Sequence, residues 1–87
     1  MKWEILVNQT DRGVGMEILR QKPGGPYQIR ERRGREIIFD RVCKDAKEVR
    51  RHLFESDQQG RRYLPEHWKL LLKKVKDEDL QALVRHT

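Results

Sequence analysis

The segment from Tyr27 to Glu55 reads YQIRERRGREIIFDRVCKDAKEVRRHLFE and contains the change of pattern that decides the fold. Its first half alternates apolar and polar residues around an Arg-rich turn, which is typical of two antiparallel strands joined in a hairpin. After Cys43 the apolar spacing changes to that of a helix, with Ala46, Val49 and Leu53 on one face. The segment therefore predicts a strand, a tight turn, a second strand and a short amphipathic helix.

The charges beside the turn suggest a register for this hairpin. A two-residue loop at Arg33 and Gly34 would place like charges directly opposite each other, which is unfavourable. A three-residue loop, Arg32 to Gly34, gives favourable pairs throughout. The expected pairs are Glu31 with Arg35, Arg30 with Glu36, Ile29 with Ile37 and Tyr27 with Phe39. This register would bury the apolar pairs and leave Arg32 and Arg33 exposed at the tip.

Two further strands are expected before the hairpin. Trp3, Ile5 and Val7 alternate with other residues at a period of two, and the alternation resumes from Met16 to Gln21. Turn-forming residues fill segment 8–15, NQTDRGVG, and segment 22–26, KPGGP. Short turns between consecutive strands indicate an antiparallel meander, with Trp3 in or near the core.

Helices are expected after the sheet. Asp45 and Glu48 fit a capping box at the start of the first helix. A loop, SDQQGRR, follows at 56–62, and Pro65 suits the first turn of a second helix. The second helix has an apolar stripe formed by Trp68, Leu71, Leu72 and Val75, and Asp77 can cap a short third helix.

These patterns predict an α+β fold in a single domain, residues 1–87. Residues 1–43 would form a four-stranded antiparallel β-meander. Residues 44–87 would form two to three α-helices packed on one face of that sheet. A chain of 87 residues can build one core but has little room for a deep active site.

Positive charge is concentrated in the middle of the chain. The formal net charge is +6, and the segment from Arg20 to Arg62 holds thirteen Lys and Arg against seven Asp and Glu. The segment therefore carries the entire excess. Clustered cations attract polyanions, and guanidinium groups suit phosphate oxygens. Such a cluster can also pair with nearby carboxylates and only solvate the surface.

The cations that could contact a polyanion fall in three places. Two lie at the hairpin tip, three on one face of the first helix beside Phe54, and two in the following loop. They are Arg32, Arg33, Lys47, Arg50, Arg51, Arg61 and Arg62. The sequence thus favours a small non-enzymatic module that binds nucleic acid, DNA or RNA, through phosphate contacts.

No catalytic, metal or cofactor motif is recognisable, so neither an enzyme nor a small-molecule substrate is predicted. His52, His67 and His86 have no metal-ligand spacing, and the single Cys43 can form no intrachain disulfide. Cys43 is better explained as a small buried residue than as a nucleophile. A small hydrolase or nuclease would require acids and a histidine to converge in one cleft.

A protein-interaction module is the alternative function: an adaptor, assembly factor or inhibitor that docks on an acidic or nucleic-acid-binding partner, or a homodimer. Leu6, Leu19 and Ile38 are expected on the outer side of their strands, where a monomer must cover them. No segment has the length and hydropathy of a membrane span, and the N-terminus does not resemble a signal peptide. We therefore expect a cytoplasmic protein that does not associate with membranes.

Overall fold

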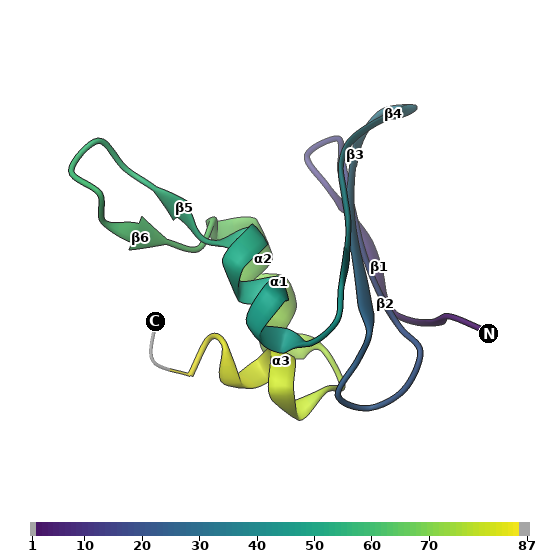
Figure 1. The fold of residues 1–87 in the computed structure, drawn as a ribbon. Coiled ribbons are helices and arrows are strands. Elements are labelled where there is room, and N and C mark those ends of the chain that lie inside the picture. Colours follow the sequence, from purple (N-terminus) through teal and green to yellow (C-terminus); the bar gives the residue numbers. More distant parts are fainter. Residues whose placement is uncertain (1, 86–87) are drawn as a thin grey trace.

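The computed structural model describes residues 2–85, so Met1, Thr87 and the third histidine, His86, lie outside the described residues. The described residues form a four-stranded antiparallel sheet in the order β1-β2-β3-β4, followed by three helices. All three helices lie on the same side of the sheet (Figure 1). The predicted α+β fold and the β-meander are confirmed.

The sheet consists of β1 (Glu4–Asp11), β2 (Val14–Arg20), β3 (Tyr27–Arg33) and β4 (Glu36–Cys43). The first two strands are longer than predicted. The turn expected over segment 8–15 shrinks to Arg12 and Gly13, whose φ angles are 53° and 83°. Two consecutive positive φ angles are typical of a two-residue hairpin turn. Because the turn needs only these two residues, the polar residues on either side of it belong to the strands.

The predicted register of the β3–β4 hairpin is wrong. Arg33 pairs with Glu36 across a two-residue turn, and Gly34 takes the left-handed φ of 63° that its first position requires. The register shifts after Glu31, so that Glu31 faces Phe39 and Tyr27 faces Cys43. The shift is a β-bulge in an edge strand, a common place for one.

The bulge also changes which residues are buried. Tyr27 and Ile29 are fully buried as predicted, but Ile37 is 47% exposed. Phe39 is partly buried and packs against the core from the edge of the sheet. A second shift, between Ile5 and Val7 in β1, leaves Ile5 60% exposed and Trp3 only partly buried.

The helices are α1 (Ala46–Leu53), α2 (Glu66–Lys74) and α3 (Glu78–Ala82). Asp45 caps α1 by accepting a hydrogen bond from the Glu48 amide at 3.0 Å, as predicted. Asp77 caps α3 in the same way through the Leu80 amide, also at 3.0 Å. These side chains satisfy amides that a helix start leaves without an internal partner.

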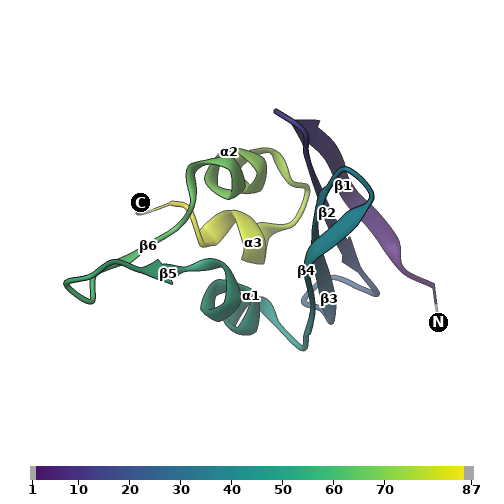
Figure 2. The ribbon, with the colours of Figure 1, turned by 90° about the horizontal axis from the view of Figure 1, so that it is seen from above.

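One element was not predicted. The segment expected to be a loop between α1 and α2 contains a two-stranded ribbon, β5 (Glu55–Ser56) and β6 (Arg62–Tyr63). Asp57 and Gly60 close its turn, and Gly60 has a φ of 80°. The ribbon starts at the C-terminal end of α1 and projects away from the sheet (Figures 1 and 2).

The core lies between the sheet and the helices (Figure 2). Ile18, Tyr27 and Ile29 from the sheet meet Val49 of α1 and Leu72 of α2, all at 0% exposure. Trp68 is buried as predicted, at 3% exposure. Among the described residues, no helix covers the opposite side of the sheet, which we call the outer face. The core therefore buries the apolar stripes of all three helices, but it buries only one of the two faces of the sheet.

Candidate functional site

A groove beside α1 brings together most of the cations that the sequence singles out. Its volume is about 310 Å³, and it is lined by Lys47, Arg50, Arg51, Phe54 and Arg62. The helix supplies the first three because positions spaced three and four residues apart share one face. Phe54 follows the last turn of α1, and β6 brings Arg62 alongside. We call these five residues the basic groove.

The cations of the basic groove lack a carboxylate partner among the described side chains. None of the described Asp or Glu side chains lies within 4.0 Å of the charged nitrogens of Lys47, Arg50, Arg51 or Arg62. Like charges three and four residues apart on a helix repel each other by a few tenths of a kcal/mol per pair. A bound anion would relieve that repulsion, so the groove is suited to a ligand that carries several negative charges.

One arginine of the groove is held against an aromatic ring. The Arg50 guanidinium carbon lies 5.2 Å from the centre of the Phe54 ring, a cation–π contact. Phe54 is itself partly buried against the core. The contact therefore orients the Arg50 side chain without neutralising its charge.

Arg61, the other cation predicted in this segment, behaves differently from Arg62. Its Nε donates to Asp57 Oδ2 at 2.8 Å within the β5–β6 ribbon, and its amide donates to Asp57 Oδ1, also at 2.8 Å. The side chain remains 78% exposed. Arg61 therefore stabilises the ribbon turn and does not line the groove.

The hairpin arginines lie apart from the groove. The β3–β4 turn lies at the opposite end of the sheet from the start of α1, and the β5–β6 ribbon projects on the other side of the molecule (Figure 1). Arg32 Nε pairs with Glu17 Oε1 at 3.1 Å, so the expectation that Arg32 is free at the tip is wrong. Arg33 is exposed and makes no ion pair with the described carboxylates.

The ion pairs predicted across the hairpin are also replaced. Arg30 Nε lies 3.4 Å from Asp40 Oδ2, and Arg30 Nη1 lies 4.0 Å from Glu17 Oε2. Neither contact involves Glu36, the expected partner. The expected partner of Arg35, Glu31, lies instead 2.8 Å from His67 Nε2 of α2. Arg30 therefore pairs with a different carboxylate of the hairpin, and Glu17 of β2 and His67 of α2 supply the remaining contacts.

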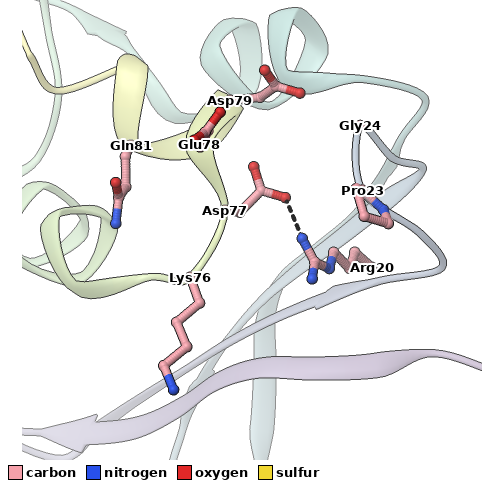
Figure 3. Close-up of a pocket in the computed structure, with 8 residues that line it drawn as sticks. All are labelled: Arg20, Pro23, Gly24, Lys76, Asp77, Glu78, Asp79 and Gln81. Carbon is pink, nitrogen blue, oxygen red and sulfur yellow. Dashed lines mark hydrogen bonds and ion pairs between the residues drawn. The ribbon is translucent and has the colours of Figure 1, made fainter.

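A second cavity, of about 410 Å³, lies between the β2–β3 turn and the start of α3 (Figure 3). Its buried carboxylate, Asp77, accepts from Arg20 Nη1 at 3.0 Å and from the Tyr27 hydroxyl at 2.9 Å. Burial, followed by the hydrogen bond to Asp77, raises the pKa of Tyr27 above its ordinary value of 10.0. Asp77 thus joins α3 to β2 and β3, and its satisfied bonds indicate a structural role.

Sequence reasoning identified Asp77 only as a helix cap. Its two tertiary partners lie 57 and 50 residues away along the chain. No local pattern links residues at such separations, so the network could not be predicted.

Acids and histidines do converge in one small cavity. Glu31, His52, Glu55 and His67 line a space of about 70 Å³ above Phe39, Leu53, Pro65 and Trp68. That volume is small beside the roughly 300–1,000 Å³ of pockets that hold small-molecule ligands. In the described part of the chain, no group of three or more His, Cys, Asp and Glu residues is placed to hold a metal ion.

The single thiol is buried and weakly acidic. Cys43 is fully buried between the sheet and α1, and burial raises its pKa to about 11. A thiol with this pKa is almost entirely protonated near pH 7 and is a poor nucleophile. The structure favours the packing explanation of Cys43.

The outer face of the sheet carries an apolar row. The row crosses all four strands: Ile5 of β1 lies opposite Leu19 of β2, and Val42 of β4 lies opposite Gln28 of β3. Leu19 and Gln28 lie opposite each other and join the two pairs. Ile5 is 60% and Val42 61% exposed. The bulge in β1 turns Leu6 toward the core, so Ile5 takes the outer place that was expected for Leu6. Ile38, at the bulge of β4, is also exposed.

No protein-family model matches this sequence, and no match was found among curated proteins or among solved structures. None of the helices between residues 2 and 85 is long and apolar enough to cross a membrane. The functional inference therefore rests on the chain's own residues.

Proposed function

We propose that this protein is a small non-enzymatic nucleic-acid-binding module that contacts phosphates through the basic groove. The observation that carries the proposal is the convergence of Lys47, Arg50, Arg51 and Arg62 on one groove without a carboxylate within 4.0 Å among the described residues. A polyanion with regularly spaced phosphates satisfies several such cations at once, and the counterions that it releases favour binding. A cytoplasmic location belongs to the same proposal.

The hairpin and ribbon arginines have a smaller part in this proposal. Arg32 and Arg61 already have carboxylate partners, so they must break an ion pair to bind phosphate. Arg33 is exposed but lies at the far end of the sheet (Figure 1). Arg33 can add a distant contact only on a long ligand.

Fluorescence anisotropy with a labelled 12-nucleotide single strand tests the proposal. Titrations from 50 to 300 mM NaCl should give a plot of log K against log salt with a slope of about −3, the value for four phosphate contacts. Lys47→Ala with Arg62→Ala should reduce that slope by about 1.4, since each lost contact changes it by about 0.7. Lys73→Ala with Lys76→Ala, exposed on and after α2, removes the same charge as a control.

Two results would reject the proposal. One is the absence of salt-dependent binding by the unmodified protein. The other is an equal loss of affinity in the groove variant and in the control, since binding would then follow net charge and not the groove.

A protein-interaction module is the second candidate, and the apolar row on the outer face favours it. Ile5 and Val42 each expose about 60% of their surface to water on a face that no helix covers. Exposed apolar patches often mark protein interfaces. An acidic partner could in addition reach the basic groove, which lies on a different part of the molecule.

Pull-down from nuclease-treated lysate tests this second candidate. A partner retained by the unmodified protein should be lost by Ile5→Ser with Val42→Ser. If both proteins retain the partner equally, the outer face is not the surface that binds it. Native mass spectrometry of the same pair reports whether the partner is a second copy of this chain.

A further inference from the structure

The Arg50–Phe54 contact distinguishes one cation of the basic groove from the other three. The guanidinium carbon lies over the Phe54 ring at 5.2 Å from its centre. Among the described residues, the only other cation–π contact is between Arg41 and Phe39, outside the groove. Arg50 is exposed, and both residues line the groove. The guanidinium therefore lies against an aromatic ring, and the side chain is open to a ligand in the groove.

A guanidinium plane held in this way is a platform for a nucleobase. Unpaired bases in protein complexes stack on aromatic rings or on arginine planes. A phosphate oxygen needs only the N–H groups at the edge of the plane, so phosphate binding does not explain the ring beneath Arg50. Bases become accessible for stacking when they are not inside a duplex.

The shape of the site also favours a single strand over a duplex. A helix that reads duplex DNA must stand out far enough to enter the major groove. Here the cationic face of α1 is bordered by Arg62 of β6, and the β5–β6 ribbon projects from the end of the helix (Figures 1 and 2). The cations line a depression of about 310 Å³ and do not form a free ridge.

The chemistry of the lining limits base selection. The five residues are one lysine, three arginines and a phenylalanine, so none of their side chains has a hydrogen-bond acceptor. The exocyclic amino groups of adenine, cytosine and guanine need acceptors for direct reading. The groove can hold a base by stacking but cannot select one by its amino group.

We infer, given the proposed function, that the groove binds unpaired nucleic acid. One base stacks on the Arg50–Phe54 pair. Lys47, Arg51, Arg62 and the N–H groups at the edge of the Arg50 guanidinium contact the flanking phosphates. Single-stranded RNA and single-stranded DNA share this chemistry, and the experiment includes both.

Anisotropy titrations with matched ligands separate the contribution of base stacking to affinity from the contribution of the phosphate charges. The probes are labelled 12-mers of oligo-U, oligo-dT and an abasic DNA strand with the same number of phosphates, together with a 12-base-pair DNA duplex. The single strands should bind about tenfold more tightly than the abasic strand. The salt slope should be the same for all three, because it counts phosphates.

Two conservative variants report on the platform itself. Arg50→Lys keeps the charge but removes the plane, and should lower affinity for oligo-dT about tenfold while leaving affinity for the abasic strand unchanged. Arg51→Lys is the matched control on the same helix and should change either affinity less than threefold. Phe54→Leu should repeat the Arg50→Lys result, and a thermal melt confirms that this variant folds.

The outcomes distinguish the inference from the function on which it rests. If no probe binds, the proposed function fails. If the abasic strand or the duplex binds as tightly as oligo-dT, the groove contacts phosphates only and the stacking inference is wrong. If Arg50→Lys and Arg51→Lys have equal effects, the Arg50–Phe54 contact has no part in binding.

Discussion

Two groups of arginines in this protein differ in what surrounds them. Arg20, Arg30 and Arg32 project from the sheet, and each has a carboxylate within 4.0 Å. Arg50, Arg51 and Arg62 line the basic groove and have none among the described residues. The first group therefore contributes to the fold, whereas the second leaves its charge free for a ligand. A cluster of arginines in a sequence does not reveal which of them have a carboxylate partner and which do not.

The largest effect is expected where a sheet arginine meets a buried carboxylate. Asp77→Ala removes the buried one of the two carboxylates beside Arg20 (the exposed Glu4 remains), the acceptor of Tyr27 and the cap of α3. Breaking a buried ion pair from one side costs about 3–5 kcal/mol. Urea denaturation should show a loss of this size in the free energy of unfolding.

Arg61→Ala is the matched control, because it breaks the exposed pair with Asp57 and keeps the backbone hydrogen bonds of the ribbon turn. Exposed pairs contribute at most about 1 kcal/mol. Equal losses in the two variants would contradict the division into buried structural pairs and exposed ones.

Charge reversal in the groove should have opposite effects on binding and on stability. Arg51→Glu should weaken binding to a single strand by about 10- to 100-fold, or about 1.4–2.8 kcal/mol. The free energy of unfolding should stay equal or rise by a few tenths of a kcal/mol, because Lys47 and Arg51 no longer repel at positions i and i+4.

Lys73→Glu makes the same charge change on α2 and should alter binding less than threefold. A large loss of stability in Arg51→Glu would show that the groove arginines also hold the fold. The distinction between the two groups would then fail.

The stability of the protein at high pH tests the hydrogen bond between Asp77 and Tyr27. The folded state holds the Tyr27 proton more tightly than the unfolded state, because burial and Asp77 raise its pKa above 10.0. This contribution is complete below pH 10 and is lost as the pH rises toward the folded-state pKa. The free energy of unfolding should therefore fall by about 1.4 kcal/mol per pH unit above pH 10.

Tyr27→Phe should reduce this slope at the cost of one hydrogen bond, and the slope that remains up to about pH 11 is expected from Cys43, whose pKa burial raises to about 11. Denaturation at pH 8, 10 and 11 measures both proteins. An unchanged slope in Tyr27→Phe would assign the alkaline effect to another group, such as the exposed Tyr63, whose pKa is raised by a hydrogen bond to Glu55.

The smallest effects are expected for an arginine that pairs on the partly exposed outer face. Arg32→Ala should lower the free energy of unfolding by less than about 1 kcal/mol. Arg32→Ala should weaken binding to a single strand less than threefold. Arg51→Ala removes the same charge and should weaken this binding more. Anisotropy and urea titrations compare the two. Equal losses of affinity would extend the binding surface to the hairpin.

Local patterns were enough for the elements and their order. The period of two in the strands, the caps at Asp45 and Asp77 and the apolar stripe around Trp68 each depend on neighbours within a few residues. The same is true of the basic face of α1, which the spacing of Lys47, Arg50 and Arg51 predicted. The structure adds Arg62 to that face because β6 pairs with β5.

The hairpin shows where local reasoning failed. Its register was derived from charge pairs within the hairpin alone. In the structure Glu31 contacts His67 of α2 and Arg32 contacts Glu17 of β2. The bulge also places Arg30 opposite Asp40 in place of Glu36, so the hairpin keeps an ion pair in a register that local charge pairing did not predict.

The sequence by itself therefore determined the α+β fold, the strand order, the helix starts and the concentration of charge in the middle of the chain. Each of these depends on spacing and composition over short distances. Only the tertiary structure decided which arginines are neutralised, because an ion pair depends on distance in space. Arg20 and Arg32 lie beside carboxylates from other elements, and Arg30 lies beside Asp40 of its own hairpin. The arginines of the basic groove have no carboxylate within 4.0 Å among the described side chains.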